Sequence, residues 1–217
     1  MSKHQYKKRI FCAGASRSGS TWQYNAVRLM AKELHASVYG AWVADYDEEN
    51  PSELHIVKLH ALKDMVFPDS PYVVTSYRNL ADVMNSILRM GWEKNPSRQK
   101  IFEWLDDYIQ SQAGWASKAA IVTRYEDIMT APRVELEKLA TALRFPLGAE
   151  QLDRIAAAVA EVRPPGDEPT ELVGYDRETL LHPGHIGRAD DNSKLTAEDR
   201  AAITQRYGDW LRARGYL

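Results

Sequence analysis

Cysteine is almost absent from this chain, since Cys12 is the single cysteine among 217 residues. One thiol excludes an intrachain disulfide and a thiolate metal cluster, and its place in an apolar run predicts that Cys12 packs in a core. The sequence also lacks an apolar stretch of about 18 residues, so no transmembrane helix is expected. Residues 1–6 show no apolar run of the kind that begins a signal peptide, which predicts a cytoplasmic location.

A marked excess of charge of either sign is also missing. The chain carries 28 basic and 30 acidic residues, which gives a formal net charge of −2. This balance argues against bulk electrostatic binding to nucleic acid or to an anionic membrane, while it still permits a local basic pocket. A chain of 217 residues without an internal repeat or a low-complexity tract is long enough for one α/β domain, which we place at residues 1–217.

Short apolar runs alternate with segments of helical periodicity, a pattern typical of a parallel α/β sheet. The runs predict strands at residues 9–13, 37–42, 55–60, 72–77 and 119–124. Helices are expected at residues 21–34, 80–90, 97–116, 132–143, 149–162 and 196–213. The predicted fold is therefore a three-layer α/β/α sandwich with a central, mainly five-stranded parallel sheet. Residues 163–183, rich in proline, glycine and acidic residues, are expected to form a loop over the active site.

The loop between the first predicted strand and helix has the frame of a phosphate-binding P-loop. From Gly14 to Trp22 it reads Gly-Ala-Ser-Arg-Ser-Gly-Ser-Thr-Trp. Its glycines allow backbone N–H groups to converge on an anion at a helix N-terminus. A nucleotide triphosphatase has a lysine where this chain has Ser20, followed by a magnesium-binding hydroxyl in the position of Thr21. Here Arg17 supplies a cation from inside the loop, which indicates a phosphorylated ligand other than a nucleoside triphosphate.

Basic side chains also follow two later predicted strands. Arg78 comes at the carboxyl end of the fourth strand, and Ser86 lies two turns into the next helix. A guanidinium and a hydroxyl placed in this way can bind a phosphate group. Lys58 and His60 end the third strand, at the edge where open α/β sheets bind their ligands. Histidine is suited to act as a general base there, because its ordinary pKa lies near neutrality.

Taken together, these segments resemble the sulfotransferases that use 3′-phosphoadenosine 5′-phosphosulfate (PAPS) as sulfuryl donor. Residues 17–22, Arg-Ser-Gly-Ser-Thr-Trp, are similar to the phosphosulfate loop of that family. Arg78, followed eight positions later by Ser86, looks like its 3′-phosphate motif, and Lys58 with His60 looks like its Lys-x-His segment. The resemblance implies PAPS as donor, 3′-phosphoadenosine 5′-phosphate (PAP) as product, and no metal requirement.

The resemblance also implies a role for each matching residue. His60 would be the general base, while Lys58 and Arg17 would stabilise charge near the sulfuryl group during an in-line transfer. Trp22 and Tyr125, the latter in a Tyr-Glu-Asp segment, would border the adenine. The donor site implied by these motifs comprises Arg17, Ser18, Gly19, Ser20, Thr21, Trp22, Arg78, Ser86 and Tyr125.

A last segment matches the family only in part. Gly184 and Gly187 keep the spacing of the family's loop over the 3′-phosphate, but a His-Pro pair replaces the Arg-Lys pair that opens it. Two alternatives stay open for this loop: either His185 or Arg188 supplies the phosphate contact, or both face solvent.

The acceptor is expected to be a hydroxyl of a small molecule or a carbohydrate. Aromatic side chains either line its site or belong to the core: Trp42, Tyr46, Trp92, Trp104, Tyr108 and Trp115. Two other functions remain as alternatives. A P-loop kinase for a small metabolite or nucleoside is disfavoured by Ser20 and by the lack of an apolar strand ending in a lone aspartate for magnesium. A non-catalytic nucleotide-binding module would keep the donor fold and retain His60 as a remnant.

Overall fold

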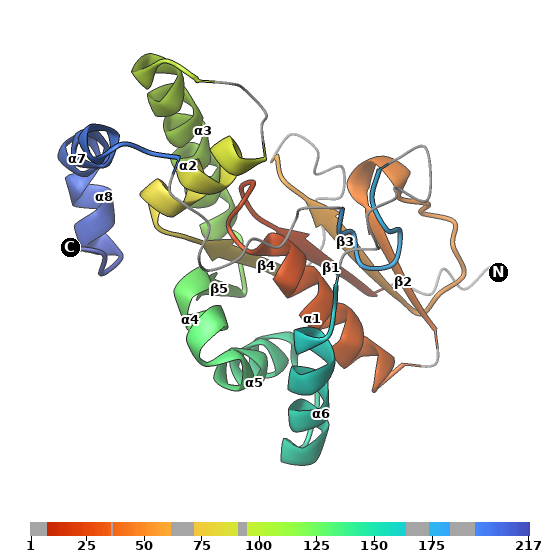
Figure 1. Ribbon diagram of the computed structural model, residues 1–217. Coiled ribbons are helices and arrows are strands. Elements are labelled where there is room, and N and C mark those ends of the chain that lie inside the picture. The colour runs from red at the N-terminus through yellow and green to blue at the C-terminus, as the bar shows by residue number, and fades with distance from the viewer. Residues whose placement is uncertain (1–7, 36, 62–71, 91–94, 164–173, 183–193) are drawn as a thin grey trace.

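The computed structural model describes residues 8–35, 37–61, 72–90, 95–163, 174–182 and 194–217. In this part of the chain a five-stranded parallel sheet has the strand order β2-β3-β1-β4-β5. Helices cover both of its faces (Figure 1), which confirms the predicted three-layer α/β/α fold. The strands are β1 (Lys8–Ala13), β2 (Val38–Trp42), β3 (Leu54–Leu59), β4 (Tyr72–Tyr77) and β5 (Ile121–Arg124).

The helices divide into two layers that pack on opposite faces of the sheet. One layer contains α1 (Ser20–Lys32), α5 (Pro132–Leu143) and α6 (Ala149–Ala160), with α4 (Tyr125–Thr130) beside α5. The other contains α2 (Leu80–Arg89), α3 (Arg98–Ala116), α7 (Ala197–Arg206) and α8 (Gly208–Ala213). A short 3₁₀ helix, η1 (Val43–Asp45), follows β2.

The position of β1 in the centre of the sheet explains why its sequence is apolar from Ile10 to Ala13. Ile10 and Cys12 pack into the core formed with α1, α5 and α6, as predicted for the cysteine. Phe11 and Ala13 point to the opposite face, toward Trp115 of α3. Since successive side chains of a strand alternate between faces and helices cover both faces, every position of β1 after its first two is buried.

The topology places the carboxyl end of β1 at a switch point of the sheet. The chain passes from β1 to β2 and β3 on one side, and then returns to β4 and β5 on the other side. In open α/β sheets the connections diverge at such a point, and the crevice between them is the usual ligand site. The loop from Gly14 to Gly19 lies there, between β1 and α1.

One predicted helix is interrupted in the structure. The single helix expected at 196–213 is divided into α7 and α8, because Tyr207 leaves the helical conformation at φ −112° and ψ 21°. Its hydroxyl bonds with the carboxylate of Asp106 and the carbonyl oxygen of Phe102, both on α3, and Gly208 follows it. Glycine disfavours a helix interior, so the contact with α3 prevails over helical continuity. Thr196 caps the start of α7, since its Oγ1 accepts a hydrogen bond from the backbone N–H of Asp199.

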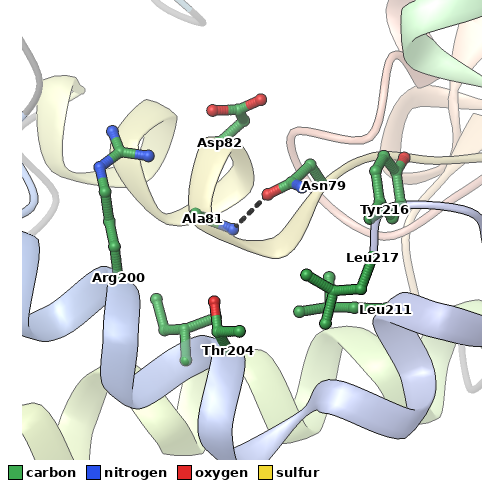
Figure 2. A pocket seen from close by; sticks show the side chains of 9 residues that line it. Asn79, Ala81, Asp82, Arg200, Thr204, Leu211, Tyr216 and Leu217 are labelled. Carbon is green, nitrogen blue, oxygen red and sulfur yellow. Dashed lines mark hydrogen bonds between the residues drawn. The ribbon is translucent and has the colours of Figure 1, made fainter.

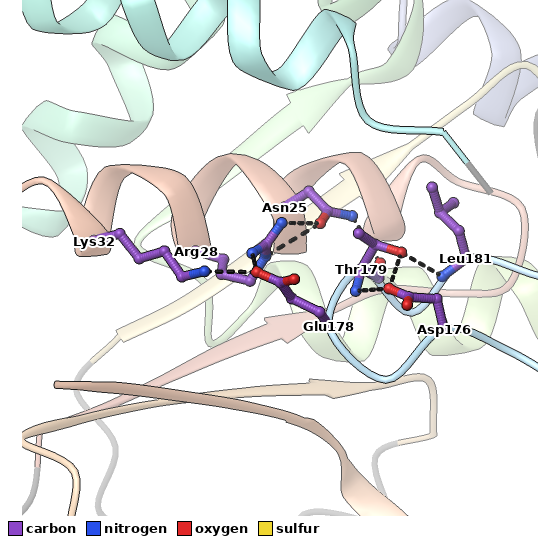
Figure 3. A network of polar contacts seen from close by, with 7 residues as sticks. All are labelled: Asn25, Arg28, Lys32, Asp176, Glu178, Thr179 and Leu181. Carbon is purple, nitrogen blue, oxygen red and sulfur yellow. Dashed lines mark hydrogen bonds and ion pairs between the residues drawn. The ribbon is translucent and has the colours of Figure 1, made fainter. Parts of the chain in front are cut away.

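Residues 174–182 are anchored to α1 by a polar network (Figure 3). Buried Arg28 and exposed Lys32 both form ion pairs with Glu178. Asn25 Nδ2 donates to the carbonyl oxygen of Thr179 over 2.8 Å, and Leu180 is buried in the α1 core. These residues belong to the predicted active-site loop at 163–183, of which 164–173 and 183 lie outside the described residues.

Candidate active site

The loop after β1 is shaped to present backbone N–H groups at the start of α1. Arg17 and Gly19 both adopt left-handed backbone conformations, with φ of 67° and 100°. Alternation between right- and left-handed residues turns successive N–H groups toward one point, as in anion-binding nests. Glycine is required at position 19, because an added Cβ would lie 2.8 Å from Cδ2 of Tyr125. The predicted anion-binding loop and its contact with Tyr125 thus form one unit.

Lys58 supplies from the neighbouring strand the lysine that the loop lacks. Its Nζ donates a hydrogen bond of 2.6 Å to Oγ1 of Thr21, in the first turn of α1. Burial, followed by the repulsion of Arg17, lowers the pKa of Lys58 from 10.5 to about 8. The ammonium therefore remains charged at neutral pH but is poorly solvated, which favours binding of an anion.

His60 is held in one orientation by its neighbours. Its Nδ1 lies 2.6 Å from the carbonyl oxygen of Gly14, and since a carbonyl only accepts, Nδ1 carries the proton. The carbonyl oxygen of His60 accepts hydrogen bonds from Trp115 Nε1 at 2.8 Å and from Ser111 Oγ at 3.2 Å. In the neutral ring Nε2 is left as the acceptor, which is the atom that a general base needs.

Electrostatics keep the His60 imidazole neutral. Burial is the largest cause, the charges of Lys58 and Arg17 add to it, and together they lower the pKa of His60 from 6.5 to about 4 although its bond to Gly14 raises it. This value lies well below the near-neutral pKa that makes histidine a common base. Since the charges of Lys58 and Arg17 contribute to the shift, an anion bound beside them would move the pKa back up.

Arg78 and Ser86 reach the same edge of the sheet from β4 and α2. The Arg78 guanidinium carbon lies 4.1 Å from the centre of the Tyr125 ring, a cation–π contact. Its Nε is buried and has no hydrogen-bond partner among the residues that the structure describes. Ser86 Oγ accepts a hydrogen bond of 2.8 Å from Nε of Arg17, so it joins the two motifs that the sequence placed apart. An anion at Arg78 would satisfy the unpaired donor.

The cations at this edge repel one another. Burial is the main cause that lowers the pKa of Arg17 to about 10, and the charges of Arg89 and Arg78 lower it further. Arg17 in turn lowers the pKa of Lys58. Arg89 belongs to none of the predicted motifs, and its position three residues after Ser86, on the same face of α2, is the sequence signal that points to it. A site in which several cations lie close enough to repel one another suits a ligand with several negative charges.

Other side chains connect the loop and the start of α1 to the sheet. Ser18 Oγ lies 3.1 Å from Ser76 Oγ on β4, and both hydroxyls are buried. Gln23 Nε2 donates to the carbonyl oxygen of Thr75 at 2.8 Å and to Thr123 Oγ1 at 2.6 Å. These contacts tie the first turns of α1 to β4 and β5. No residue-type signal in the sequence singles them out, because each pairs residues that are remote along the chain.

The remaining predicted residues have varied positions. Ser20 and Thr21 are buried in the first turn of α1, and Trp22 is half-buried beside the α1 core. Of the aromatic residues expected to line the acceptor site or belong to the core, Tyr108 and Trp115 belong to the core. The Trp42 ring lies near the candidate site instead, 5.0 Å from the His60 ring between centroids. Five residues lie outside the described part of the chain: Trp92, Gly184, His185, Gly187 and Arg188.

Two further findings concern metal and membrane. Within the described residues, His, Cys, Asp and Glu side chains form no group of three or more that could hold a metal ion. No helix in that same part of the chain combines the length and the apolar character that crossing a membrane requires.

The sheet, its two helical layers and the loop after β1 form a three-layer α/β/α fold with a P-loop-like connection. No protein-family model matches the chain, and no curated protein matches it in sequence. Solved structures do match it. Mouse sulfotransferase SULT7A1 complexed with PAP is 14% identical with a TM-score of 0.65, and the match covers 95% of this chain and 84% of that one.

Retinol dehydratase is similar in two further complexes. The complex with retinol and PAP is 17% identical with a TM-score of 0.54, and that with androsterone and inactive cofactor PAP is 16% identical with a TM-score of 0.51. Each match covers 70% of this chain and 64% of the other, so this chain spans less than two thirds of retinol dehydratase. The chain has the fold of these PAP-bound structures, among them a sulfotransferase, and the resemblance stated from the sequence is confirmed for the fold.

Proposed function

We propose that this protein is a sulfotransferase that takes the sulfuryl group from PAPS and transfers it to an acceptor hydroxyl. The observation that carries the proposal is the convergence of four cations on the P-loop frame, with Lys58 bonded to Thr21 in place of a loop lysine. PAP, the nucleotide in the similar structures, carries phosphates at two separate positions. Arg17 with Lys58 would bind the 5′ side, and Arg78 with Arg89 would bind the 3′-phosphate.

The residues present fit such a donor. The unpaired Arg78 Nε and the mutually repelling cations are destabilising in the protein alone, and phosphate oxygens would satisfy them. Tyr125 lies against both Arg78 and Gly19, which supports its predicted place beside the adenine. Retinol and androsterone, named in the retinol dehydratase complexes, are small molecules, which supports a small-molecule acceptor over a carbohydrate. A cytoplasmic location stays a prediction.

In this proposal the chemistry of the chain's own residues is limited to proton transfer and charge stabilisation. PAPS supplies a sulfuryl group whose transfer leaves negative charge on a 5′-phosphate oxygen. His60 Nε2 accepts the proton of the acceptor hydroxyl, because its Nδ1 is committed to Gly14. Lys58, Arg17 and the loop N–H groups stabilise the developing negative charge from the start of α1.

The test begins with nucleotide binding and ends with turnover. PAP should bind at least about tenfold more tightly than ADP, since an ionic hydrogen bond to the 3′-phosphate contributes about 1.5 to 3 kcal/mol. Calorimetry on the unmodified protein and on Arg78→Ala measures this preference, which the substitution should largely remove. Incubation with PAPS and a panel of alcohols, phenols and sugars, read by mass spectrometry, should then show products heavier by one SO₃ group, with EDTA present.

Each alternative has its own outcome. Turnover that EDTA abolishes and magnesium restores would favour the kinase. Tight PAP binding without transfer to any acceptor in the panel would favour the non-catalytic module, and equal affinities for PAP and ADP would contradict the assignment of the 3′-phosphate motif.

A further inference from the structure

The turn that carries Arg78 is held by side chains from two other helices. Arg78 and Asn79 lie between the end of β4 and the start of α2, so their N–H groups have no place in a strand ladder or in the helix. The Arg78 N–H donates to Tyr108 Oη over 2.9 Å, and the Asn79 N–H donates to Glu126 Oε1 over 3.1 Å. Two consecutive backbone positions are therefore fixed, and with them the direction in which the Arg78 side chain leaves the turn.

Glu126 connects this turn to the segment that follows α8. Its second oxygen, Oε2, accepts hydrogen bonds from Tyr216 Oη at 2.7 Å and from Arg124 Nε at 3.3 Å. The Arg124 guanidinium also lies 4.4 Å from the centre of the Tyr216 ring. The Trp210 ring stacks on the same Tyr216 ring, with 6.2 Å between the two centroids. One carboxylate is thus shared between the turn at Asn79 and the hydroxyl of Tyr216.

The Tyr77 and Tyr216 rings lie 6.2 Å apart between centroids, so packing links the end of β4 to the segment after α8. Asn79 and Tyr216 line a pocket of about 270 Å³ between the first turn of α2 and the helices α7 and α8 (Figure 2). Across a space of this size side chains lose their dispersion contacts. At Asn79, one residue beyond Arg78, the link to Tyr216 runs through the hydrogen bonds of Glu126, in addition to the ring contact at Tyr77.

We propose that Glu126 and Tyr216 are positioning residues for recognition of the 3′-phosphate. Glu126 holds the Asn79 N–H, Tyr216 fixes the Glu126 carboxylate, and the pair aims Arg78 at the phosphate without touching the ligand. This inference rests on the proposed function, because it takes the 3′-phosphate of the donor as the group that Arg78 binds. It adds two residues that the sequence motifs did not assign to the site.

The experiment compares PAP, which carries a 3′-phosphate, with ADP, which has none and carries its second phosphate on the 5′ side. Calorimetry gives the dissociation constants of PAP and ADP for the unmodified protein and for Glu126→Ala, Glu126→Gln and Tyr216→Phe. The matched control is Glu137→Ala, which removes an exposed carboxylate paired with Arg133 on α5. Thermal melting of each variant establishes that it is folded.

The expected result is a loss of affinity for PAP with little change in the affinity for ADP. Glu126→Ala should weaken PAP binding about tenfold, since an ionic hydrogen bond that orients the turn is lost, and should leave ADP binding within about twofold. Glu126→Gln keeps an oxygen for the Asn79 N–H and should restore most of the loss. Tyr216→Phe, which removes one hydroxyl, should weaken PAP binding about threefold and add nothing in combination with Glu126→Ala, because the two act in series.

Two results would overturn the inference. Equal loss of PAP and ADP affinity would mean that Glu126 only stabilises the fold, and unchanged PAP affinity in Glu126→Ala and Tyr216→Phe would mean that the turn positions Arg78 without them. Should Glu126→Ala fail to fold, the Tyr216→Phe result decides. An unmodified protein that does not prefer PAP over ADP contradicts the proposed function itself, a result distinct from both.

Discussion

Replacing Lys58 by methionine is expected to stabilise the protein while it destroys donor binding. Burial and the charge of Arg17 lower the Lys58 pKa from 10.5 to about 8, which corresponds to about 3 kcal/mol of destabilisation at pH 7. Lys58 is only 4% exposed, so solvent screening offsets little of this. Methionine fills a similar volume, and the lost bond to Thr21 costs about 1 kcal/mol. The expected net gain is about 2 kcal/mol in the free energy of unfolding.

The dependence of this gain on pH identifies its cause. Below pH 8 Lys58 is protonated in the folded protein, and the buried charge lowers the free energy of unfolding by its full amount. Between about pH 8 and 10.5 the unfolded chain binds the proton and the folded one has lost it, so the stability of the unmodified protein rises with pH. The difference between the two proteins, measured by urea unfolding without nucleotide, should therefore shrink over this range and change sign before pH 10.5, because the lost bond to Thr21 still disfavours methionine.

A surface lysine provides the control. Lys138 on α5 forms an ion pair with Glu135, which raises its pKa, so Lys138→Met should not stabilise the protein. PAP should raise the unfolding free energy of the unmodified protein and have a much weaker effect on Lys58→Met. A Lys58→Met variant that is less stable at pH 7, or a difference that stays constant with pH, would refute this reasoning.

Three further substitutions or titrations test other parts of the site. His60→Ala should leave PAP affinity within a few-fold and lower turnover by about 10² to 10⁴, the usual contribution of a positioned base; near-normal rates would show that His60 only packs. NMR titration should give His60 a pKa of about 4 in the free protein and a higher value with PAP bound, because the nucleotide offsets the nearby cations; an unchanged value would contradict this. Gly19→Ala should destabilise the protein by about 1 to 3 kcal/mol and weaken PAP binding, through backbone strain and contact with Tyr125. The control is Gly174→Ala, where φ is also positive at 70° but no atom lies within 4 Å of the new Cβ, so only backbone strain is added. If both variants lose the same free energy of unfolding in urea, contact with Tyr125 has no part in the effect.

The sheet was predictable because both of its faces are covered. Burial on two sides makes β1 an unbroken apolar run after its first two residues, and the predicted strands lie within about two residues of those found. The helix ends were less predictable where tertiary contacts decide them, as at Tyr207, whose side chain bonds with α3. The Tyr-Glu-Asp segment, expected after the last strand, begins the short helix α4.

The individual residues of the candidate active site were predictable from the sequence, but the contacts between them were not. Strand ends and loop composition identify Lys58, His60, Arg17 and Arg78. The bond from Lys58 to Thr21 spans 37 positions, and that from Arg17 to Ser86 spans 69, so no local pattern records either. The pKa of His60 depends in the same way on which cations the fold brings beside it.

The origin of these cations in separate strands has a consequence for folding. Arg17, Lys58 and Arg78 follow or end β1, β3 and β4, so they are far apart in the unfolded chain and meet only when those strands pair. Such non-local pairing is slow, and here it must also bring like charges together. A bound nucleotide would offset that repulsion: at a hundred times its Kd it stabilises the folded state by about 2.7 kcal/mol. In a cell the supply of donor would then set how much of the protein escapes proteolysis, so that its abundance would follow the availability of activated sulfate.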